Sequence, residues 1–442
     1  MELTREEMSQ FGEAYDLDPT NRVIEGAIAK VGAAEASYNP AALSKHTFTF
    51  SVEVTTGEIT DQKKSGRCWL FASLNSLRPA IIAKLGVKTF EFSQSYLYFF
   101  DKMEKANMFL EHVADTLDAP DDDRTLRCAL ANHVSDGGDW DWFCSLAEKW
   151  GVVPHEAMPD TFNATDSHAF VSRMELHLLR AAADMRAAHA AGEDERVEDI
   201  RYGVLADIYA IGRKALGTPP THFTYDYRDK DDAFHRIEQT TPQEFLAEYV
   251  GLEELNKRIV IGYDPRPEHP FGRVLQVPFL RGMSGGRPIS AFNVPIEVMK
   301  RALIAQLTDN KAVYFGCDVD RDSDRKAGIL DPDLYRADET LAPLGEMEED
   351  DRARYGARVP THAMTFTGVN LDAEGAPITW KVENSWGDEC GKKGIFSMAD
   401  AWFDLHMVTC VVEKAYVDAE YAAGLDAEPI DLEPWDMLFG SV

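Results

Sequence analysis

The chain has 442 residues, 45% of them apolar, which is enough for two or three domains of ordinary size or for one enlarged domain with a substantial core. Lysine and arginine number 45, and aspartate and glutamate number 76, so the formal net charge is −31 at pH 7. This acidic balance argues against binding to nucleic acid and to anionic membranes, whereas cationic or amine-bearing partners are compatible with it.

Residues 1–60 predict an N-terminal arm. It begins with a short acidic helix and continues into the alternating segment 46–56, HTFTFSVEVTT, which is typical of a strand. The N-terminus lacks a basic start followed by an apolar run, and no later stretch approaches the roughly 18 apolar residues of a membrane span. We therefore expect a cytoplasmic protein without membrane contact.

Two helical regions follow the arm. Residues 61–160 predict a helical lobe, which is interrupted at 135–143 by the sequence SDGGDWDWF. Residues 161–265 predict a helical insertion, because long stretches with helical periodicity occupy 170–191 and 195–217.

The second half of the chain changes character. Another helix is expected to begin at Thr241, because Thr241 and Glu244 form a capping box with Pro242 at the first helical position. Residues 266–425 then predict a β-rich lobe with an antiparallel sheet, and 426–442 a C-terminal arm. The segments rich in β-branched and aromatic residues are 311–319, 362–372, 376–386, 391–399 and 409–417. The fold class expected from this order is α+β.

The six cysteines are far apart and include no CxxC pair, which argues against a disulfide framework and against a zinc site. Cys68 stands out by its local sequence, QKKSGRCWLFASLNS at 62–76. This stretch reads as a loop that runs into a buried helix, with Cys68 at the helix start. The free N–H groups and the helix dipole favour a thiolate there. A buried structural cysteine is the alternative interpretation.

A cysteine nucleophile needs a base, a group that orients the base, and donors for the developing oxyanion. Gln62 lies six residues before Cys68 and could supply one donor beside the Cys68 N–H. His362 opens one predicted strand and Asn384 follows another, so neighbouring strands could bring the amide to the imidazole. Trp386 could then shield that hydrogen bond from water.

In this combination the residues resemble the papain-like cysteine peptidases. That family shows Q-x5-C-W at the nucleophile, a Gly-Gly loop in the substrate cleft, a histidine on a strand and an N-S-W-G segment. The corresponding residues occur here in the same order, as Gln62, Cys68-Trp69, Gly137-Gly138, His362 and Asn384-Ser385-Trp386-Gly387.

Two departures narrow the resemblance. Ser65 stands where secreted members carry a disulfide cysteine, and His362 follows Cys68 by 294 residues (362 − 68) rather than by about 130–150. The predicted insertion at 161–265 accounts for the surplus. From about residue 5 to its C-terminus, the chain is similar to the group of bleomycin hydrolase and bacterial aminopeptidase C.

This resemblance implies a papain-like two-lobed core with a large helical insertion, and a homohexameric barrel with active sites facing an internal chamber. It implies a cysteine aminopeptidase, without metal or cofactor, that acts on peptides with a free N-terminus. The C-terminal arm would lie in the cleft, where the Val442 carboxylate meets the substrate's α-ammonium group. The implied catalytic residues are Cys68, His362, Asn384 and Gln62, and the implied substrate-binding residues are Gly137, Gly138, Trp386 and Val442.

Other interpretations stay open at this point. The last six residues, MLFGSV, differ from the proline-containing, alanine-rich ending expected of the group. If the C-terminal arm does not block the cleft, the alternative function is that of an endopeptidase or a broad amidase. Gly137-Gly138 could be an ordinary turn, and an inactive binding or chaperone-like barrel is a further alternative.

Overall fold

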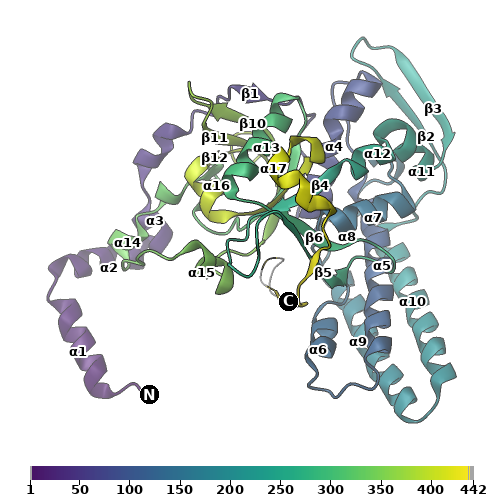
Figure 1. Ribbon diagram of the computed structural model, residues 1–442, viewed down its shortest axis with the longest axis horizontal. Helices are drawn as coiled ribbons and strands as arrows, with labels where there is room; N and C mark the ends of the chain where they lie inside the picture. Colours follow the sequence, from purple (N-terminus) through teal and green to yellow (C-terminus); the bar gives the residue numbers. More distant parts are fainter. Residues whose placement is uncertain (1, 437, 439–442) are drawn as a thin grey trace.

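The structure is a computed structural model that describes residues 2–436 and 438. It has a body built around a large sheet, a protruding group of long helices, and an N-terminal arm (Figure 1). The helices are α1 (Arg5–Asp16), α2 (Pro19–Val31), α3 (Ala33–Ser37), α4 (Cys68–Leu85), α5 (Gln94–Asp115), α6 (Arg124–Ala131), α7 (Trp140–Trp150), α8 (Phe162–Thr165), α9 (His168–Ala190), α10 (Asp194–Leu216), α11 (Pro242–Phe245), α12 (Leu252–Asn256), α13 (Ile296–Thr308), α14 (Ala337–Thr340), α15 (Glu349–Arg354), α16 (Asp400–His406) and α17 (Ala419–Ala422).

The strands fall into one large sheet and one hairpin. They are β1 (Val52–Glu53), β2 (Phe223–Arg228), β3 (Phe234–Thr240), β4 (Arg258–Gly262), β5 (Arg273–Arg281), β6 (Pro288–Asn293), β7 (Val313–Cys317), β8 (Ser323–Asp324), β9 (Ile329–Leu330), β10 (His362–Leu371), β11 (Pro377–Glu383), β12 (Ile395–Ala399), β13 (Met407–Glu413) and β14 (Ile430–Asp431). The large sheet has the order β14-β5-β6-β4-β13-β7-β10-β11-β12-β9-β8, with β1 paired to β10. The expected α+β class is therefore confirmed.

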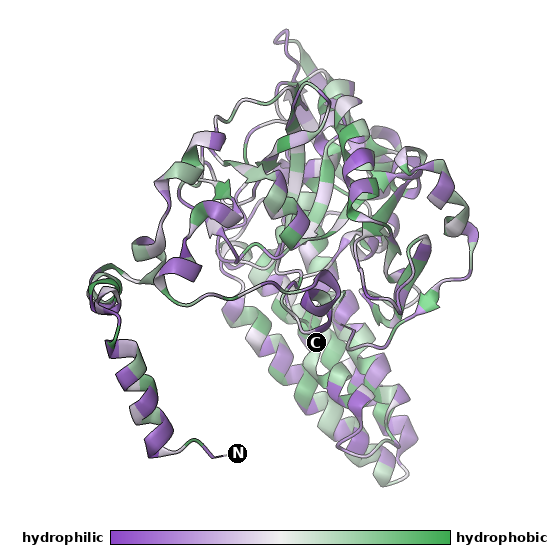
Figure 2. Ribbon diagram, turned by 60° about the vertical axis from the view of Figure 1, so that its left-hand side comes forward, coloured by the Kyte–Doolittle hydropathy of each residue, from purple (hydrophilic) through white to green (hydrophobic). Residues whose placement is uncertain are grey.

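The N-terminal arm stands away from the body (Figure 1), and neither α1 nor α2 buries a residue. Local signals fix these two helices. Thr4 and Glu7 form a complete capping box at α1, and the Asp18 side chain accepts a hydrogen bond from the Thr20 N–H at α2. Figure 2 shows many hydrophilic residues in α1, as expected of an arm that does not pack on its own body. Of the expected strand at 46–56, only β1 forms.

The two long helices expected after residue 161 are α9 and α10, which pack on each other and on α5 in the protrusion (Figure 1). The capping box at Thr241 is present and starts α11. The β2–β3 hairpin was not expected inside this region. It forms because Tyr225 packs its ring against Phe90 of the helical lobe, at 6.0 Å between centroids, which gives the hairpin an apolar surface to cover.

The five strands expected in the β-rich half are neighbours in the sheet, in the order β13-β7-β10-β11-β12, and all pair antiparallel. The whole sheet differs from the purely antiparallel expectation, because the pairs β4–β6, β9–β12 and β5–β14 are parallel. Strands β4, β5 and β6 were not expected, and they extend the sheet beyond β13.

Separate apolar cores fill the helical lobe and the β-rich lobe. Helix α4 belongs to the first core and packs against β10 of the second, where the Thr365 hydroxyl donates to the Ala72 carbonyl at 3.2 Å. The start of α4 and the start of β10 therefore meet at the junction of the two lobes. Among the described residues, no helix combines the length and apolar character that crossing a membrane requires. The domain boundaries given above remain predictions.

Candidate active site

Cys68 is the first residue of α4, at the edge of a cavity of about 360 Å³. The Arg67 side chain does not cap the helix, so the first N–H groups of α4 stay available for an anion at this end. Burial raises the pKa of the Cys68 thiol, whereas the backbone N–H groups of Ala363, Trp69 and Cys68 itself act in the opposite direction. The position combines a partly exposed cysteine with backbone donors that stabilise a thiolate.

The loop before Cys68 is held by a buried guanidinium. Arg67 has no exposed side-chain surface, and it makes a bidentate ion pair with Asp160, with both N–O distances 2.9 Å. It also donates from Nε to the Ser65 hydroxyl at 2.9 Å. The same loop pairs with the chain around residues 165–167, since the Lys64 N–H donates to the Thr165 carbonyl. The nucleophile is thus fixed by residues that lie about 90 positions further along the chain.

Gln62 lies in the same loop and is buried. Its side-chain Nε2 donates to the Ser65 carbonyl at 2.7 Å, and its Oε1 accepts from the Ser385 hydroxyl at 2.7 Å. These two bonds fix which end of the amide is the donor. An amide nitrogen carries two hydrogens, and Ser65 uses one of them, so the second is left for another acceptor.

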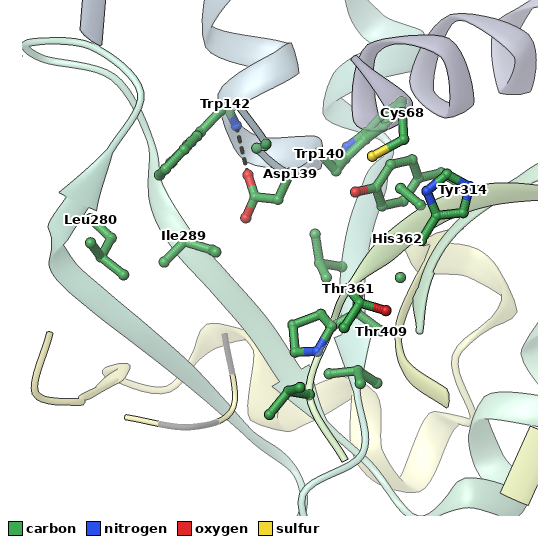
Figure 3. Close-up of a pocket in the computed structure, with 18 of the residues that line it drawn as sticks. Cys68, Asp139, Trp140, Trp142, Leu280, Ile289, Tyr314, Thr361, His362 and Thr409 are labelled. Carbon is green, nitrogen blue, oxygen red and sulfur yellow. Dashed lines mark hydrogen bonds between the residues drawn. The ribbon is translucent and has the colours of Figure 1, made fainter. Parts of the chain in front are cut away.

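His362 opens β10 and lies opposite Cys317 of β7. Its Nε2 is 3.0 Å from Oδ1 of Asn384, the residue that directly follows β11. Because an amide oxygen only accepts, Nε2 carries the proton and Nδ1 is the second ring nitrogen, left for the cleft. Cys68 and His362 line the same cavity (Figure 3), and Asn384 is joined to His362 by its hydrogen bond, so the expected sulfur, imidazole and amide gather at one site.

Trp386 covers this hydrogen bond. Its indole stacks on the His362 ring with 4.8 Å between centroids, and the Arg325 guanidinium lies 4.2 Å from the indole centroid. Asn384 has no exposed surface. Burial lowers the pKa of His362 to about 4, while the Asn384 hydrogen bond acts to raise it. Burial alone therefore favours the neutral thiol and imidazole, and the charged pair depends on the helix start and on mutual attraction.

Gly137 and Gly138 line the cavity together with Cys68 and His362. Gly137 has φ of 100°, a conformation suited to glycine. A Cβ on Gly138 would lie 2.6 Å from the Trp69 ring, so only glycine allows this close approach beside the nucleophile. Gln62, Asn384 and Trp386 are not among the residues that line this cavity.

The C-terminal arm runs to the same cavity. Strand β14 pairs with β5, and Asp436 then forms an ion pair with Arg266 at 2.6 Å. Leu438 is buried and lines the cavity that contains Cys68. Val442, the implied site for the substrate amine, lies outside the described residues.

One group of side chains among the described residues has the composition of a metal site, namely Asp264, His269 and Asp436. Arg266 already bridges both carboxylates, at 2.6 Å to each, and His269 Nδ1 lies 2.7 Å from Asp264. The guanidinium occupies the place of a cation, so the cluster anchors the arm and does not need a metal.

Sequence reasoning missed several residues that build the site. Ser385 was part of the N-S-W-G segment, but its contact with Gln62 follows only from the folded chain. The Arg67–Asp160 pair gave no local signal. Tyr314 and Asp139 also line the cavity with Cys68 (Figure 3). Asp139 directly follows Gly137-Gly138, and that adjacency could have drawn attention to it.

Comparisons with known proteins agree with this geometry. The sequence model of the Peptidase C1-like family matches residues 2–439. Aminopeptidase G of Lactobacillus delbrueckii subsp. lactis is 40% identical over 437 residues, 99% of each chain, and aminopeptidase C of Listeria monocytogenes is 38% identical over 435 residues, 98% of each chain. The crystal structure of PepW from Lactobacillus rhamnosis is similar with a TM-score of 0.95 and 38% identity, over 99% of this chain and 98% of that one.

Proposed function

Because this chain belongs to the Peptidase C1-like family, we propose that it is a cysteine aminopeptidase that removes N-terminal residues from peptides. Relatives named as aminopeptidases, about 40% identical over nearly the whole chain, support this function. The observation that carries the proposal is the 3.0 Å contact between His362 Nε2 and Asn384 Oδ1, because it leaves Nδ1 for the thiol at the start of α4.

In the first half of the reaction, His362 Nδ1 takes the proton of Cys68, and the thiolate attacks the carbonyl carbon of the first peptide bond. The backbone N–H of Cys68 and the second amide hydrogen of Gln62 stabilise the oxyanion. The tetrahedral intermediate collapses when the imidazolium gives its proton to the nitrogen of the leaving peptide. The C–N bond breaks, and the first residue stays bound to Cys68 as a thioester.

In the second half, His362 takes a proton from a water molecule, which attacks the thioester carbonyl. The same donors hold the second oxyanion, and the C–S bond breaks as His362 returns its proton to the Cys68 sulfur. Asn384 keeps the ring in one tautomer throughout, and Trp386 excludes water from the bond between Asn384 and His362.

The restriction to free N-termini is part of the proposal. Leu438 in the cavity wall supports an arm that closes one end of the cleft, where the Val442 carboxylate would meet the substrate amine. An endopeptidase or broad amidase is the alternative if the arm leaves that end open. We also propose a homohexamer in the cytoplasm. Helix α1 buries no residue in this chain, and its exposed Met8, Phe11 and Tyr15 lie along one side of the helix. This apolar side supports contact with another subunit.

The direct test uses leucyl-aminomethylcoumarin and its N-acetylated form. The wild-type protein should release coumarin from the free-amine substrate only, and an epoxide thiol reagent should label Cys68 and stop the reaction. Cys68→Ala should lower kcat by about 10⁴-fold or more without unfolding the chain. Turnover retained in this variant would refute the assignment of the nucleophile, and equal hydrolysis of both substrates would favour the endopeptidase.

A further inference from the structure

Two carboxylates line the cavity that contains Cys68, and the described structure uses them differently. Asp136 is fully engaged: its oxygens bind the Lys102 ammonium at 2.9 Å and the Tyr98 and Ser167 hydroxyls at 2.6 and 2.9 Å. Burial opposes the charge of Asp136, but the Lys102 ammonium and these hydrogen bonds hold its pKa well below the usual range. Asp136 thus supports the wall of the cavity and has no capacity left for a ligand.

Asp139 is in the opposite situation. It is half-buried, and one of its oxygens accepts the Trp142 N–H at 3.0 Å as the cap of α7. Figure 3 shows the other oxygen directed into the cavity. Within residues 2–436 and 438, Asp139 makes no ion pair, and the neighbouring Lys105 is held by Asp101 and by the Ser135 and Gly137 carbonyls.

The surroundings make an unpaired charge at Asp139 costly. The cavity near it is walled by Trp142, Leu280 and Ile289 (Figure 3). Burial raises the pKa of Asp139 well above its usual range, and the nearby Asp141 carboxylate adds to that effect. A cation that enters the cavity would therefore replace a proton and gain an ionic hydrogen bond in an apolar setting.

The position along the cleft indicates which cation fits. Gly138 lies against the Trp69 ring, and Trp69 follows the nucleophile, so the segment 137–139 runs beside Cys68. A peptide laid along this backbone with its first carbonyl at Cys68 has its α-amino group only two bonds from the reacting carbon. The Asp139 carboxylate, which directly follows Gly138 and makes no ion pair among the described residues, lines the same cavity.

We infer that Asp139 binds the α-ammonium group of the substrate's first residue and thereby contributes to the selection of free N-termini. This inference rests on the proposed aminopeptidase function and names a residue for its specificity. Asp139 acts in substrate binding, because it has no proton-transfer partner in the reaction described above.

The test compares leucyl-aminomethylcoumarin with 4-methylpentanoyl-aminomethylcoumarin, which lacks only the α-amino group. Asn also caps helices, so Asp139→Asn should keep the start of α7 intact. It should lower kcat/KM for the leucyl substrate by about 10- to 100-fold and leave the desamino substrate unchanged. Asp123→Asn is the matched control, because Asp123 caps α6 in the same way, by accepting from the Leu126 N–H, and does not line the cavity; it should not change the ratio of the two substrates.

The outcomes separate this inference from the proposed function. A wild-type protein without preference for the leucyl substrate would contradict the aminopeptidase itself. If Asp139→Asn keeps the preference for the leucyl substrate, or if the preference is lost only when residues 439–442 are removed, the role of Asp139 is overturned and the proposed function still stands.

An equal loss of kcat/KM on both substrates would make the role of Asp139 structural. Arginyl-aminomethylcoumarin is measured as a third substrate, and a loss confined to it would mean that Asp139 binds the substrate's side chain. Either result overturns the inference.

Discussion

The two walls of the cleft are stabilised by different means. On the helical wall, charges surround the nucleophile: the buried Arg67 pairs with Asp160, and Lys102 with Asp136. On the sheet wall, the groups around His362 are neutral or aromatic, with an amide from Asn384 and the stacked indole of Trp386. The first wall depends on ion pairs between distant parts of the chain, and the second on strand register.

This difference indicates that the helical wall mainly controls stability and the sheet wall mainly controls kcat. An unpaired buried charge costs several kcal/mol, so damage to the helical wall should appear first as lost stability. A neutral hydrogen bond contributes about 1 kcal/mol to stability, but it can fix the tautomer of a catalytic base. Damage to the sheet wall should therefore appear first in kcat.

The largest expected effect comes from the helical wall. Arg67→Met leaves the Asp160 carboxylate without its partner at a mostly buried site, and should lower the free energy of unfolding by about 3–5 kcal/mol. Urea denaturation followed by fluorescence measures this loss. Arg67→Met combined with Asp160→Leu removes both charges and should recover much of the stability. If the single variant unfolds at the wild-type urea concentration, the helical wall does not depend on this pair.

The second effect concerns pH and the sheet wall. The folded pKa of His362 is about 4, below the value of about 6.5 for an unfolded histidine. The unfolded chain therefore binds the proton more tightly, and the stability from neutral His362 is complete above pH 6.5 and is lost as the pH falls toward 4. In a Cys68→Ala background, this residue should contribute about 3 kcal/mol between these limits.

The control for this pH dependence is His362→Gln in the same Cys68→Ala background. All other titrating groups are shared, so the difference between the two pH profiles isolates His362. The quantity compared is the free energy of unfolding of the two variants. If their difference does not change between pH 7.5 and 3.5, or if the variant with His362 gains stability as the pH falls, a buried neutral imidazole is contradicted.

The third effect is catalytic. Asn384→Ala removes the acceptor of the His362 Nε2 proton, so the ring loses its fixed tautomer and orientation. We expect kcat to fall by about 10²-fold, at the lower end of what general acid–base catalysis contributes. The thermal midpoint of unfolding, measured in parallel, should change much less than in Arg67→Met. If the thermal midpoint of Asn384→Ala falls as much as that of Arg67→Met while kcat changes little, the proposed difference between the two walls is contradicted.

The smallest effect should come from the contact that joins the walls. Ser385→Ala removes the donor to Gln62 Oε1, while the Ser65 carbonyl still holds the Gln62 amide from the other side. The loss of one hydrogen bond corresponds to a decrease in kcat of about 10-fold or less. Steady-state kinetics with leucyl-aminomethylcoumarin gives this value. Ser73→Ala, on the inner side of α4, is a control that should leave kcat unchanged.

The parts of the site that sequence alone predicted share a local origin. Cys68 was recognisable because a loop-to-helix transition is encoded in adjacent residues, and His362 because it opens a strand rich in β-branched and aromatic residues. The meeting of these segments agrees with the family resemblance, and the structure places Cys68, His362 and Asn384 together. Their roles in catalysis remain predictions.

The missed features arise from contacts between distant residues. Nothing near Arg67 indicates that Asp160 will neutralise it, because the pairing exists only after the chain has folded. The β2–β3 hairpin was missed because its stability comes from packing on Phe90, which is far away in sequence. Asp139 was not singled out in the sequence, because its place in the cavity wall and its second oxygen, which has no hydrogen-bond partner among the described residues, are visible only in the folded chain.

The ion pair between Arg67 and Asp160 also limits how this protein can be re-engineered. Asp160 directly precedes Thr161, the N-cap of α8, near the start of the long helical region, and residues 165–167 pair with the loop that carries the nucleophile. A chimera that exchanges the protruding helices for those of another protein must therefore keep this aspartate and the short segment after it. If the junction of the chimera is placed after residue 167, the contacts that hold the loop before Cys68 are kept.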